Sequence, residues 1–251
     1  MLFTSALGAL SCLLLGATAS PVDLEKRQQP PAVPPYVAQG VAIYSCTKPN
    51  TVALTFDDGI VTGLAEKVIT LLNNAGMKGT FFVNGQNWEY LGNHKATLQR
   101  MLSSNHQIGS HTYSHPHLPE LNREGIKAEM IDLENLMVDL IGRYPTYMRP
   151  PYFEFNNEVL SVAKGLKYRV IITDLDTNDW KNDPAASLRD FKTGLDQKKT
   201  IVLAHDVHAS TVNTLLPNMI AELKRRGMKS VTVGECLGEH PNNWYRWGKR
   251  N

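Results

Sequence analysis

Seven short runs of apolar and β-branched residues alternate with segments of helical periodicity, and this alternation restricts the fold more than any other feature of the sequence. The runs lie at residues 51–56, 78–83, 107–110, 147–149, 168–173, 200–204 and 230–233. Strands that alternate with helices are typical of a parallel sheet covered by helices. We therefore expect one α/β domain, a distorted (β/α) barrel of about seven parallel strands. Periodicity does not exclude an open doubly wound sheet.

Six helical segments are expected between these runs, at residues 63–74, 94–104, 120–142, 156–164, 185–195 and 212–226. The segment 120–142 has the clearest pattern, because its apolar residues recur at spacings of three and four and Gly142 follows as a stop signal. A chain of 251 residues with 42% hydrophobic residues is large enough for one core of this kind.

The first 45 residues have the composition of leader and linker segments. Residues 2–19 form an apolar run that ends in small residues, so we expect a signal peptide over 1–19, with a membrane anchor as the alternative. A short propeptide over 20–27 would end at the dibasic pair Lys26-Arg27, and residues 28–45 form a Pro-rich linker. The catalytic domain is expected over 46–240 and a tail over 241–251. A secreted protein, extracellular or in the cell wall, follows from this organisation.

The net charge restricts the possible binding partners, and the cysteine count predicts a disulfide. The formal net charge is +2 and no basic cluster is present, which argues against nucleic acid or an acidic membrane surface as partner. Of three cysteines, Cys12 would leave with the signal peptide, and a secreted chain with two remaining cysteines is expected to form one disulfide, Cys46 to Cys236. These two flank the first and last expected strands, which are neighbours in a closed barrel. A monomer is expected.

Two adjacent carboxylates follow the first expected strand, where Thr51 to Phe56 leads into Asp57, Asp58 and Gly59. Ligands bind at the carboxyl ends of strands in α/β proteins. Neighbouring side chains on an extended backbone point in different directions, so one carboxylate can bind a metal while the other faces a substrate. Asp-Asp-Gly as a simple turn is the alternative.

Two histidines follow the third strand, His111 and His115, at a spacing that allows both imidazoles to bind one ion. With Asp57 or Asp58 as third ligand the set is two His and one carboxylate, and a catalytic zinc would keep an open position for water. Non-haem iron accepts the same set. An iron oxygenase would show His-x-Asp on an all-β scaffold, and this chain shows neither.

Three later strand ends also carry polar groups that a core would not require. They belong to the segments Arg149-Pro-Pro-Tyr152, Asp176-Thr-Asn-Asp-Trp180 and His205-Asp206. Each has a structural explanation when taken alone, such as an ion pair, a helix cap or a satisfied buried histidine. Their recurrence at successive strand ends favours one shared site.

These segments, taken in order, resemble the motifs of the polysaccharide deacetylase family, carbohydrate esterase family 4. The resemblance covers about residues 46–240 and rests on Thr55-Phe-Asp-Asp-Gly59, His111-Thr-Tyr-Ser-His115, Arg149-Pro-Pro-Tyr152, Asp176-Thr-Asn-Asp-Trp180 and Leu203-Ala-His205-Asp206. Two further stretches are similar to secreted fungal chitin deacetylases, Phe81-Phe-Val-Asn-Gly85 and Val231-Thr-Val-Gly-Glu-Cys-Leu-Gly238. Ile60 departs from the family, which often has Pro after Asp-Asp-Gly.

The resemblance implies a role for each motif residue. It implies that Asp57 is the catalytic base and that three residues bind Zn²⁺, or another divalent ion such as Co²⁺: Asp58, His111 and His115. Arg149 would orient Asp57, and His205 would be the general acid with Asp179 behind it. Tyr152 would offer its backbone N–H to the oxyanion. Trp180 and Leu203 would form the walls of the pocket for the acetyl methyl.

The activity that follows is metal-dependent hydrolysis of N-acetyl groups on chitin or chitooligosaccharides. Two other hydrolase activities of the family stay open, on acetylxylan and on peptidoglycan. A third possibility is an inactive glycan-binding module that stacks sugars on Trp244, Tyr245 and Trp247. A binder needs neither base nor acid, so the complete residue set argues against it, and packing on the barrel is the expected use of these aromatics.

Overall fold

The computed structural model describes residues 36–250. The expected signal peptide, the expected propeptide and residues 28–35 of the expected linker lie outside the described residues. In the rest of that linker Ala42–Ile43 forms a strand, β1, which pairs in parallel with β7 (Arg169–Ile171). Among the described helices, none combines the length and apolar character needed to cross a bilayer.

A curled sheet of parallel strands organises the chain. Within residues 36–250 it has nine strands, and its main path runs β1, β7, β6, β4, β3, β2, β9, β8. The remaining bounds are β2 Thr51–Asp57, β3 Gly79–Val83, β4 Gln107–Ser110, β6 Tyr147–Met148, β8 Leu175–Asp176, β9 Ile201–His205 and β10 Lys229–Ser230. Each of the seven expected runs therefore overlaps a strand, and the sheet is a distorted, incompletely closed barrel. The two-residue strands β1 and β8 were not expected, because so short a segment has no periodicity to detect.

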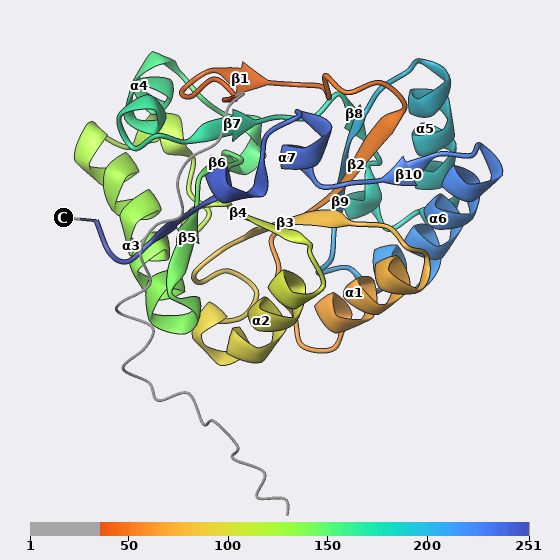
Figure 1. Cartoon of the computed structure of the whole chain (residues 1–251), viewed down its shortest axis with the longest axis horizontal. Coiled ribbons are helices and arrows are strands. Elements are labelled where there is room, and N and C mark those ends of the chain that lie inside the picture. Colours follow the sequence, from red (N-terminus) through yellow and green to blue (C-terminus); the bar gives the residue numbers. More distant parts are fainter. Residues whose placement is uncertain (1–35, 251) are drawn as a thin grey trace, which may run out of the picture.

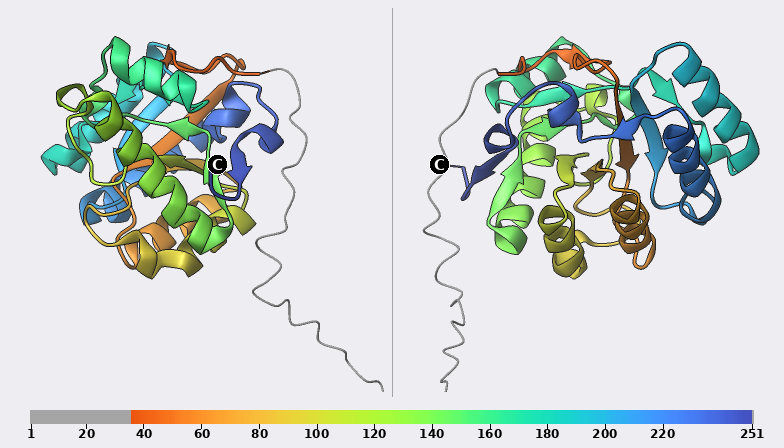
Figure 2. Two further views of the ribbon diagram at one scale, coloured as in Figure 1. Left: turned by 90° about the vertical axis from the view of Figure 1, so that its left-hand side faces the viewer. Right: turned by 45° about the vertical axis from the view of Figure 1, so that its right-hand side comes forward.

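Helices surround the sheet on its outside (Figure 1; Figure 2). In chain order they are α1 Leu64–Asn74, α2 Lys95–Ser103, α3 Arg123–Ile141, α4 Asn157–Gly165, α5 Pro184–Asp196, α6 Leu216–Arg225 and the short α7 Val233–Cys236. The segment carrying β1 runs across the side between α4 and α5. The main core packs between helices and sheet, and the strand β2 is buried from Val52 to Asp57.

Local signals place most helix ends. The side chain of Asn122 accepts the N–H of Gly125 at the start of α3, and Gly142 ends the helix in the left-handed conformation, with φ 73°. The expected helix 212–226 is divided into a π-helical segment, Thr211–Leu215, and α6. Pro217 stands in the first turn of α6, directly after the π-helical segment.

The prediction of a last strand over 230–233 was wrong at its carboxyl end. The strand β10 stops at Ser230, and Thr232 caps α7 by accepting the N–H of Glu235. A Thr followed three residues later by Glu is a helix-start signal, and here it outweighs the β-branched composition of 230–233.

The disulfide prediction is confirmed, with Cys46 and Cys236 bonded and their Cα atoms 5.1 Å apart. The last of the seven expected strands does lie beside the first of them, since Ser230 of β10 pairs with Val52 of β2. This pairing does not close the barrel, because β2 already has β3 and β9 as neighbours along the main path. Cys46 precedes β2 and Cys236 follows β10. The two cysteines lie close together because β10 pairs with the first two residues of β2.

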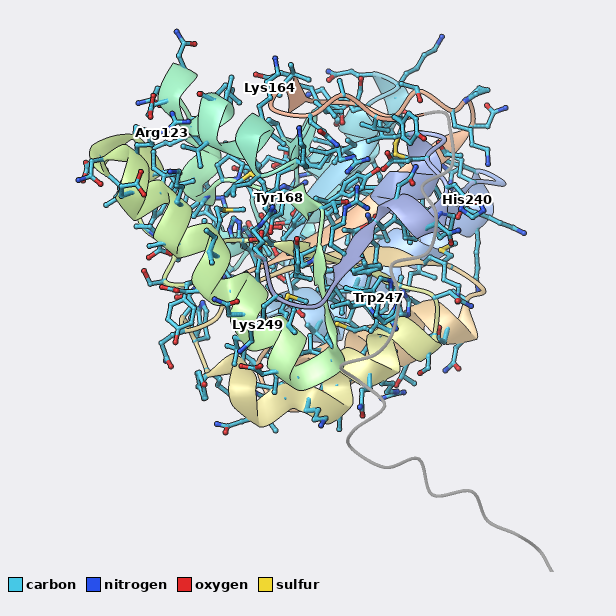
Figure 3. All side chains as sticks on the ribbon, turned by 60° about the vertical axis from the view of Figure 1, so that its left-hand side comes forward. Arg123, Lys164, Tyr168, His240, Trp247 and Lys249 are labelled. Carbon is cyan, nitrogen blue, oxygen red and sulfur yellow. A yellow bond between two sulfur atoms is a disulfide. The ribbon has the colours of Figure 1, made fainter. Side chains whose placement is uncertain are left out.

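The C-terminal segment is attached to the outer part of the domain. The strand β11 (Tyr245–Trp247) pairs in antiparallel fashion with β5 (Arg143–Pro145). Beyond it, Nζ of Lys249 lies 3.1 Å from Oδ2 of Asp139 on α3, and Figure 3 shows Trp247 and Lys249 on this side of the molecule. Trp244 and Tyr245 are each 8% exposed. The packing expected for the C-terminal aromatics is confirmed for these two.

Candidate active site

The expected site residues converge at the carboxyl ends of the strands. Asp57 is the last residue of β2 and pairs in register with His205 at the end of β9. His111 follows β4, and Arg149 follows β6. They border one cavity of about 440 Å³, whose lining residues are Asp57, Asp58, His111, His115, Pro150, Tyr152, Phe153, Asp176, Trp180, Leu203 and His205. A larger cavity, of about 770 Å³, is lined by none of these residues.

Asp58, His111 and His115 form a cluster suited to one metal ion. Oδ1 of Asp58 lies 3.4 Å from Nε2 of His111 and 3.2 Å from Nε2 of His115. One donor atom from each residue lies within 4.8 Å of the other two. The spacing of the motifs had left Asp57 and Asp58 equivalent, and the geometry selects Asp58.

The electrostatics of Asp58 fit this assignment. Its Oδ1 is buried and has no hydrogen-bond donor among the described residues, which is costly unless a cation or water occupies the space beside it. Burial alone would raise the pKa of Asp58, but the His111 and His115 imidazoles hold the pKa well below its usual range. The carboxylate is therefore ionised and ready to bind a cation.

The tautomer of His111 is set by its surroundings. Nδ1 lies 2.8 Å from the carbonyl oxygen of Arg149. A carbonyl only accepts, so Nδ1 carries a hydrogen, and in the neutral imidazole that binds a metal the lone pair is on Nε2, the nitrogen nearest Asp58. Metal-binding histidines characteristically donate their other ring N–H in this way. Two imidazoles and one carboxylate match the donor set of a catalytic zinc with an open position.

Arg149 holds the second carboxylate, Asp57. The guanidinium is fully buried, and its Nη1 donates to Oδ1 of Asp57 at 2.8 Å and to Oγ1 of Thr55 at 2.7 Å. Its other nitrogens donate to the backbone carbonyls of Ile171 and Ile172. With these contacts on several sides the guanidinium has little freedom to move, so the orientation of Asp57 is well defined.

Asp179 holds His205 much as Arg149 holds Asp57. Oδ1 of Asp179 lies 2.8 Å from Nδ1 of His205, and Oδ2 accepts the backbone N–H of His205 at 2.7 Å. Thr211 donates its hydroxyl to the same Oδ2. Burial lowers the pKa of His205, but the hydrogen bond and charge of Asp179, with the charges of Asp57 and Asp58, raise it to about 9. The imidazole is therefore protonated at neutral pH.

Apolar and aromatic side chains surround these polar groups. Leu203 is buried and lines the cavity, whereas the rings of Tyr152 and Trp180 are 53% and 51% exposed. The backbone of Tyr152 has φ 56° and follows two prolines. Its ring stacks on His117 with centroids 4.1 Å apart. The cavity thus has an apolar part and an exposed aromatic edge.

Comparison with known proteins identifies the family. The model of the family described as polysaccharide deacetylase matches residues 44–171. The chain belongs to this family. A chitin deacetylase of Pestalotiopsis sp. is 43% identical over 242 residues, which cover 95% of this chain and 78% of that protein.

Two further relatives show how the likeness extends within the polysaccharide deacetylase family. A probable peptidoglycan-N-acetylglucosamine deacetylase of Arthroderma benhamiae is 43% identical over 212 residues, 82% of this chain and 48% of that protein. The structure of the chitin deacetylase of Colletotrichum lindemuthianum superimposes with a TM-score of 0.82 at 39% identity. The match covers 86% of this chain and 99% of that chain.

Each site residue expected from the deacetylase resemblance lies at the cavity or directly behind it. Asp179 and Arg149 do not line the cavity but contact residues that do. Sequence reasoning missed Thr211, which belongs to no strand-end motif, and Pro150 and Phe153 as lining residues. The motif Asp176-Thr-Asn-Asp-Trp180 could not reveal Thr211, because the hydrogen bond joins Asp179 to a residue 32 positions away.

Proposed function

We propose that this protein hydrolyses N-acetyl groups of N-acetylglucosamine units in chitin or chitooligosaccharides, releasing acetate and leaving glucosamine units. The observation that supports this best is the arrangement around one cavity. It has three metal-binding side chains, a carboxylate held by Arg149 and an imidazole held by Asp179. The likeness to two chitin deacetylases over most of the chain favours chitin as substrate.

Zinc is the proposed metal, bound by Asp58, His111 and His115, and Co²⁺ is expected to substitute for it. The unpartnered Oδ1 of Asp58 and the tautomer of His111 both favour a cation at this position. When bound, zinc lowers the pKa of a water molecule and polarises a carbonyl group.

The proposed proton transfers use two groups on adjacent strands. Asp57 takes a proton from the attacking water, and Arg149 keeps the carboxylate aimed at that position. His205 starts protonated and gives its proton to the sugar nitrogen as the C–N bond breaks. Because Asp57 and His205 are paired in register on β2 and β9, base and acid face one substrate at the same time.

The remaining residues bind the acetamide group. The backbone N–H of Tyr152 is proposed to donate to the acetyl oxygen as negative charge develops there. Leu203 and Trp180 are proposed to form the apolar pocket that takes the acetyl methyl group, since both line the cavity. The exposed ring of Tyr152 offers a surface for an adjacent sugar ring.

Peptidoglycan is a second candidate substrate, because the Arthroderma benhamiae relative carries that name at the same identity. The deciding experiment measures acetate release from chitin pentamer, acetylxylan and peptidoglycan side by side, with mass spectra of the products. We expect chitin pentamer to lose acetyl groups fastest. Faster release from peptidoglycan would overturn chitin as substrate, and no release from any of them would support a glycan-binding module.

We further propose that the protein is secreted after removal of residues 1–27, with a catalytic domain over 46–240. The Cys46–Cys236 disulfide supports this, because disulfides form and persist in oxidising compartments. Mass spectrometry of the secreted protein would test it, with Gln28 as the expected first residue. A protein that starts at Ser20 would show that the dibasic pair is not cleaved. We propose a monomer, to be tested by light scattering.

A further inference from the structure

Asn84 lies directly after β3, between the two segments that carry the metal-binding residues. The first segment is the turn 58–59 after β2, and the second is the loop 111–115 after β4. Asn84 is only 2% exposed, lines no part of the site cavity and has no role in the chemistry above. A buried amide at this position requires an explanation from its contacts.

The side chain of Asn84 forms hydrogen bonds to the segment after β4, beyond the point where the backbone hydrogen bonds between β3 and β4 end. The parallel pairing of β3 and β4 ends at Val83 and Ser110, followed by one more bond from the N–H of His111 to the carbonyl of Val83. Beyond this point Nδ2 of Asn84 donates to two carbonyl oxygens in succession, that of His111 at 2.5 Å and that of Thr112 at 3.1 Å. Carbonyl oxygens only accept, so the NH₂ group must face them.

The backbone that receives these bonds is in an unfavourable conformation. Thr112 has φ 70° and is fully buried, and His115 has φ 60°. A β-branched residue in the left-handed region is an outlier that persists only where its surroundings enforce it. Oγ1 of Thr112 in turn accepts the N–H of His115 at 3.2 Å. The conformation of Thr112 therefore decides where both histidines lie.

Asn84 also contacts the segment that carries the carboxylates. Its backbone N–H donates to the carbonyl of Gly59 at 3.2 Å, one residue after Asp58. Asp58 too has a positive φ, 72°. Gly85 follows, and a Cβ there would lie 2.3 Å from the Tyr113 ring, so a glycine is needed for Asn84 to approach the loop this closely.

We propose that Asn84 is a positioning residue for the metal centre. It joins the Asp58 turn to the His111–His115 loop and holds Thr112 in its left-handed conformation, so that three donor atoms are in place before the metal arrives. The inference rests on the proposed metal-dependent function. Residues that orient metal ligands typically contribute about 10- to 100-fold to metal affinity.

The test compares two isosteric substitutions. Asn84→Asp keeps the shape of the side chain but turns an oxygen toward both carbonyls, and we expect Zn²⁺ affinity to fall by about 10- to 100-fold. The control is Asn157→Asp, because Asn157 is exposed at the start of α4 and its side chain forms no hydrogen bond with Asn84 or with the two metal-binding segments. Its affinity should equal that of the parent. Affinity is measured by competition with a chromophoric chelator, and the visible spectrum of the Co²⁺ protein reports ligand geometry.

A merely structural role is excluded by two further variants. Leu72→Ala makes a cavity in the core under α1 and should lower stability while leaving the Zn²⁺ affinity unchanged. Thr112→Gly removes the cost of the positive φ, so Asn84→Ala should weaken Zn²⁺ binding less in that background than in the parent. This difference is the specific expectation of the proposal.

The outcomes separate this proposal from the proposed function. Parent-like Zn²⁺ affinity and Co²⁺ spectrum in Asn84→Asp would overturn the role of Asn84 and leave the metal site intact. An equal loss in Asn157→Asp or Leu72→Ala would overturn it as well. So would an effect of Asn84→Ala that is the same in the Thr112→Gly background as in the parent. A parent protein that binds no divalent metal would overturn both proposals.

Discussion

Asp179 binds His205 at two points, through the ring nitrogen Nδ1 and through the backbone N–H. One carboxylate thus determines both the position and the charge of the imidazole. The contact fixes the direction of the remaining ring nitrogen, Nε2, which is the proton donor in the proposed reaction. It also accounts for a pKa raised to about 9 in a buried histidine, whose pKa burial alone would lower.

The first prediction concerns pH. A general acid must be protonated, so the rate of the parent should fall as pH rises through about 9. In Asp179→Asn the charge of the carboxylate is lost and the pKa of His205 should return toward its ordinary value. The alkaline limb of the kcat/KM profile should therefore move to lower pH. An alkaline limb that stays in place in the variant would contradict this role.

The second prediction concerns the metal. Removal of the divalent ion with a chelator should abolish acetate release, and added Zn²⁺ should restore it. His111→Ala and His115→Ala should each lose metal binding together with turnover, because either change leaves two of the three protein ligands. Metal content is measured by elemental analysis beside activity. Full activity in a chelated protein shown to be metal-free would disprove metal dependence.

The third prediction separates the two adjacent carboxylates. Asp57→Asn should keep its metal and lose rate by about 10²- to 10⁴-fold, the usual contribution of a general base. Asp58→Asn should instead weaken metal affinity, since its Oδ1 faces both imidazoles. Metal affinity and kcat are measured for both variants. The assignment fails if Asp57→Asn stays active while both variants lose metal equally.

The fourth prediction concerns the disulfide. The bond joins residues 190 positions apart. Closing so long a loop stabilises by up to about 5 kcal/mol in the chain-entropy model. The double variant Cys46→Ser/Cys236→Ser should therefore lose several kcal/mol in the free energy of unfolding, measured by denaturant titration. Thiol labelling of the denatured, unreduced protein from residue 28 onward should find no free cysteine, whereas two labelled thiols would refute the bond.

The fifth prediction concerns Asp206, a buried carboxyl group whose two oxygens have no hydrogen-bond partner among residues 36–250. Burial and the charges of Asp58 and Asp57 raise its pKa to about 8. Between pH 4 and 8 the folded state then binds more protons here than the unfolded state does, so this residue lowers stability as pH rises.

Asp206→Asn should remove that penalty. In chelated protein the variant should gain stability over the parent as pH rises from 4 to 8, and the gain should stay constant above pH 8. Urea titrations across this range measure the gain, with Asp132→Asn on the outer surface of α3 as control. A gain that does not change with pH would show that Asp206 is ionised throughout.

Much of the site was predictable because catalytic side chains follow strands, and strands have a readable pattern. The run 51–56 is recognisable by its β-branched and apolar residues, so Asp57 and Asp58 are expected at its carboxyl end. The same reasoning places His111 and His205. Thr211 was not predictable as a site residue, because it acts through a contact with a segment distant in the sequence and no periodicity records such a contact. Asn84 also follows an expected strand, but its bonds to the loop after β4 could not be read from the sequence for the same reason.

The sequence by itself determined the parallel α/β architecture, the cysteine pair and the residues able to act as base, acid and metal ligands. Residue spacing alone left Asp57 and Asp58 open as the metal ligand, and the family resemblance implied Asp58. Only the tertiary structure shows why the carboxylate of Asp58 is the one that faces both imidazoles. That choice depends on the left-handed backbone of Asp58 and on Arg149, which reaches Asp57 from a strand three places away along the sheet. Such a conformation is stable only once surrounding segments hold it, so it is a property of the packed molecule rather than of any local stretch.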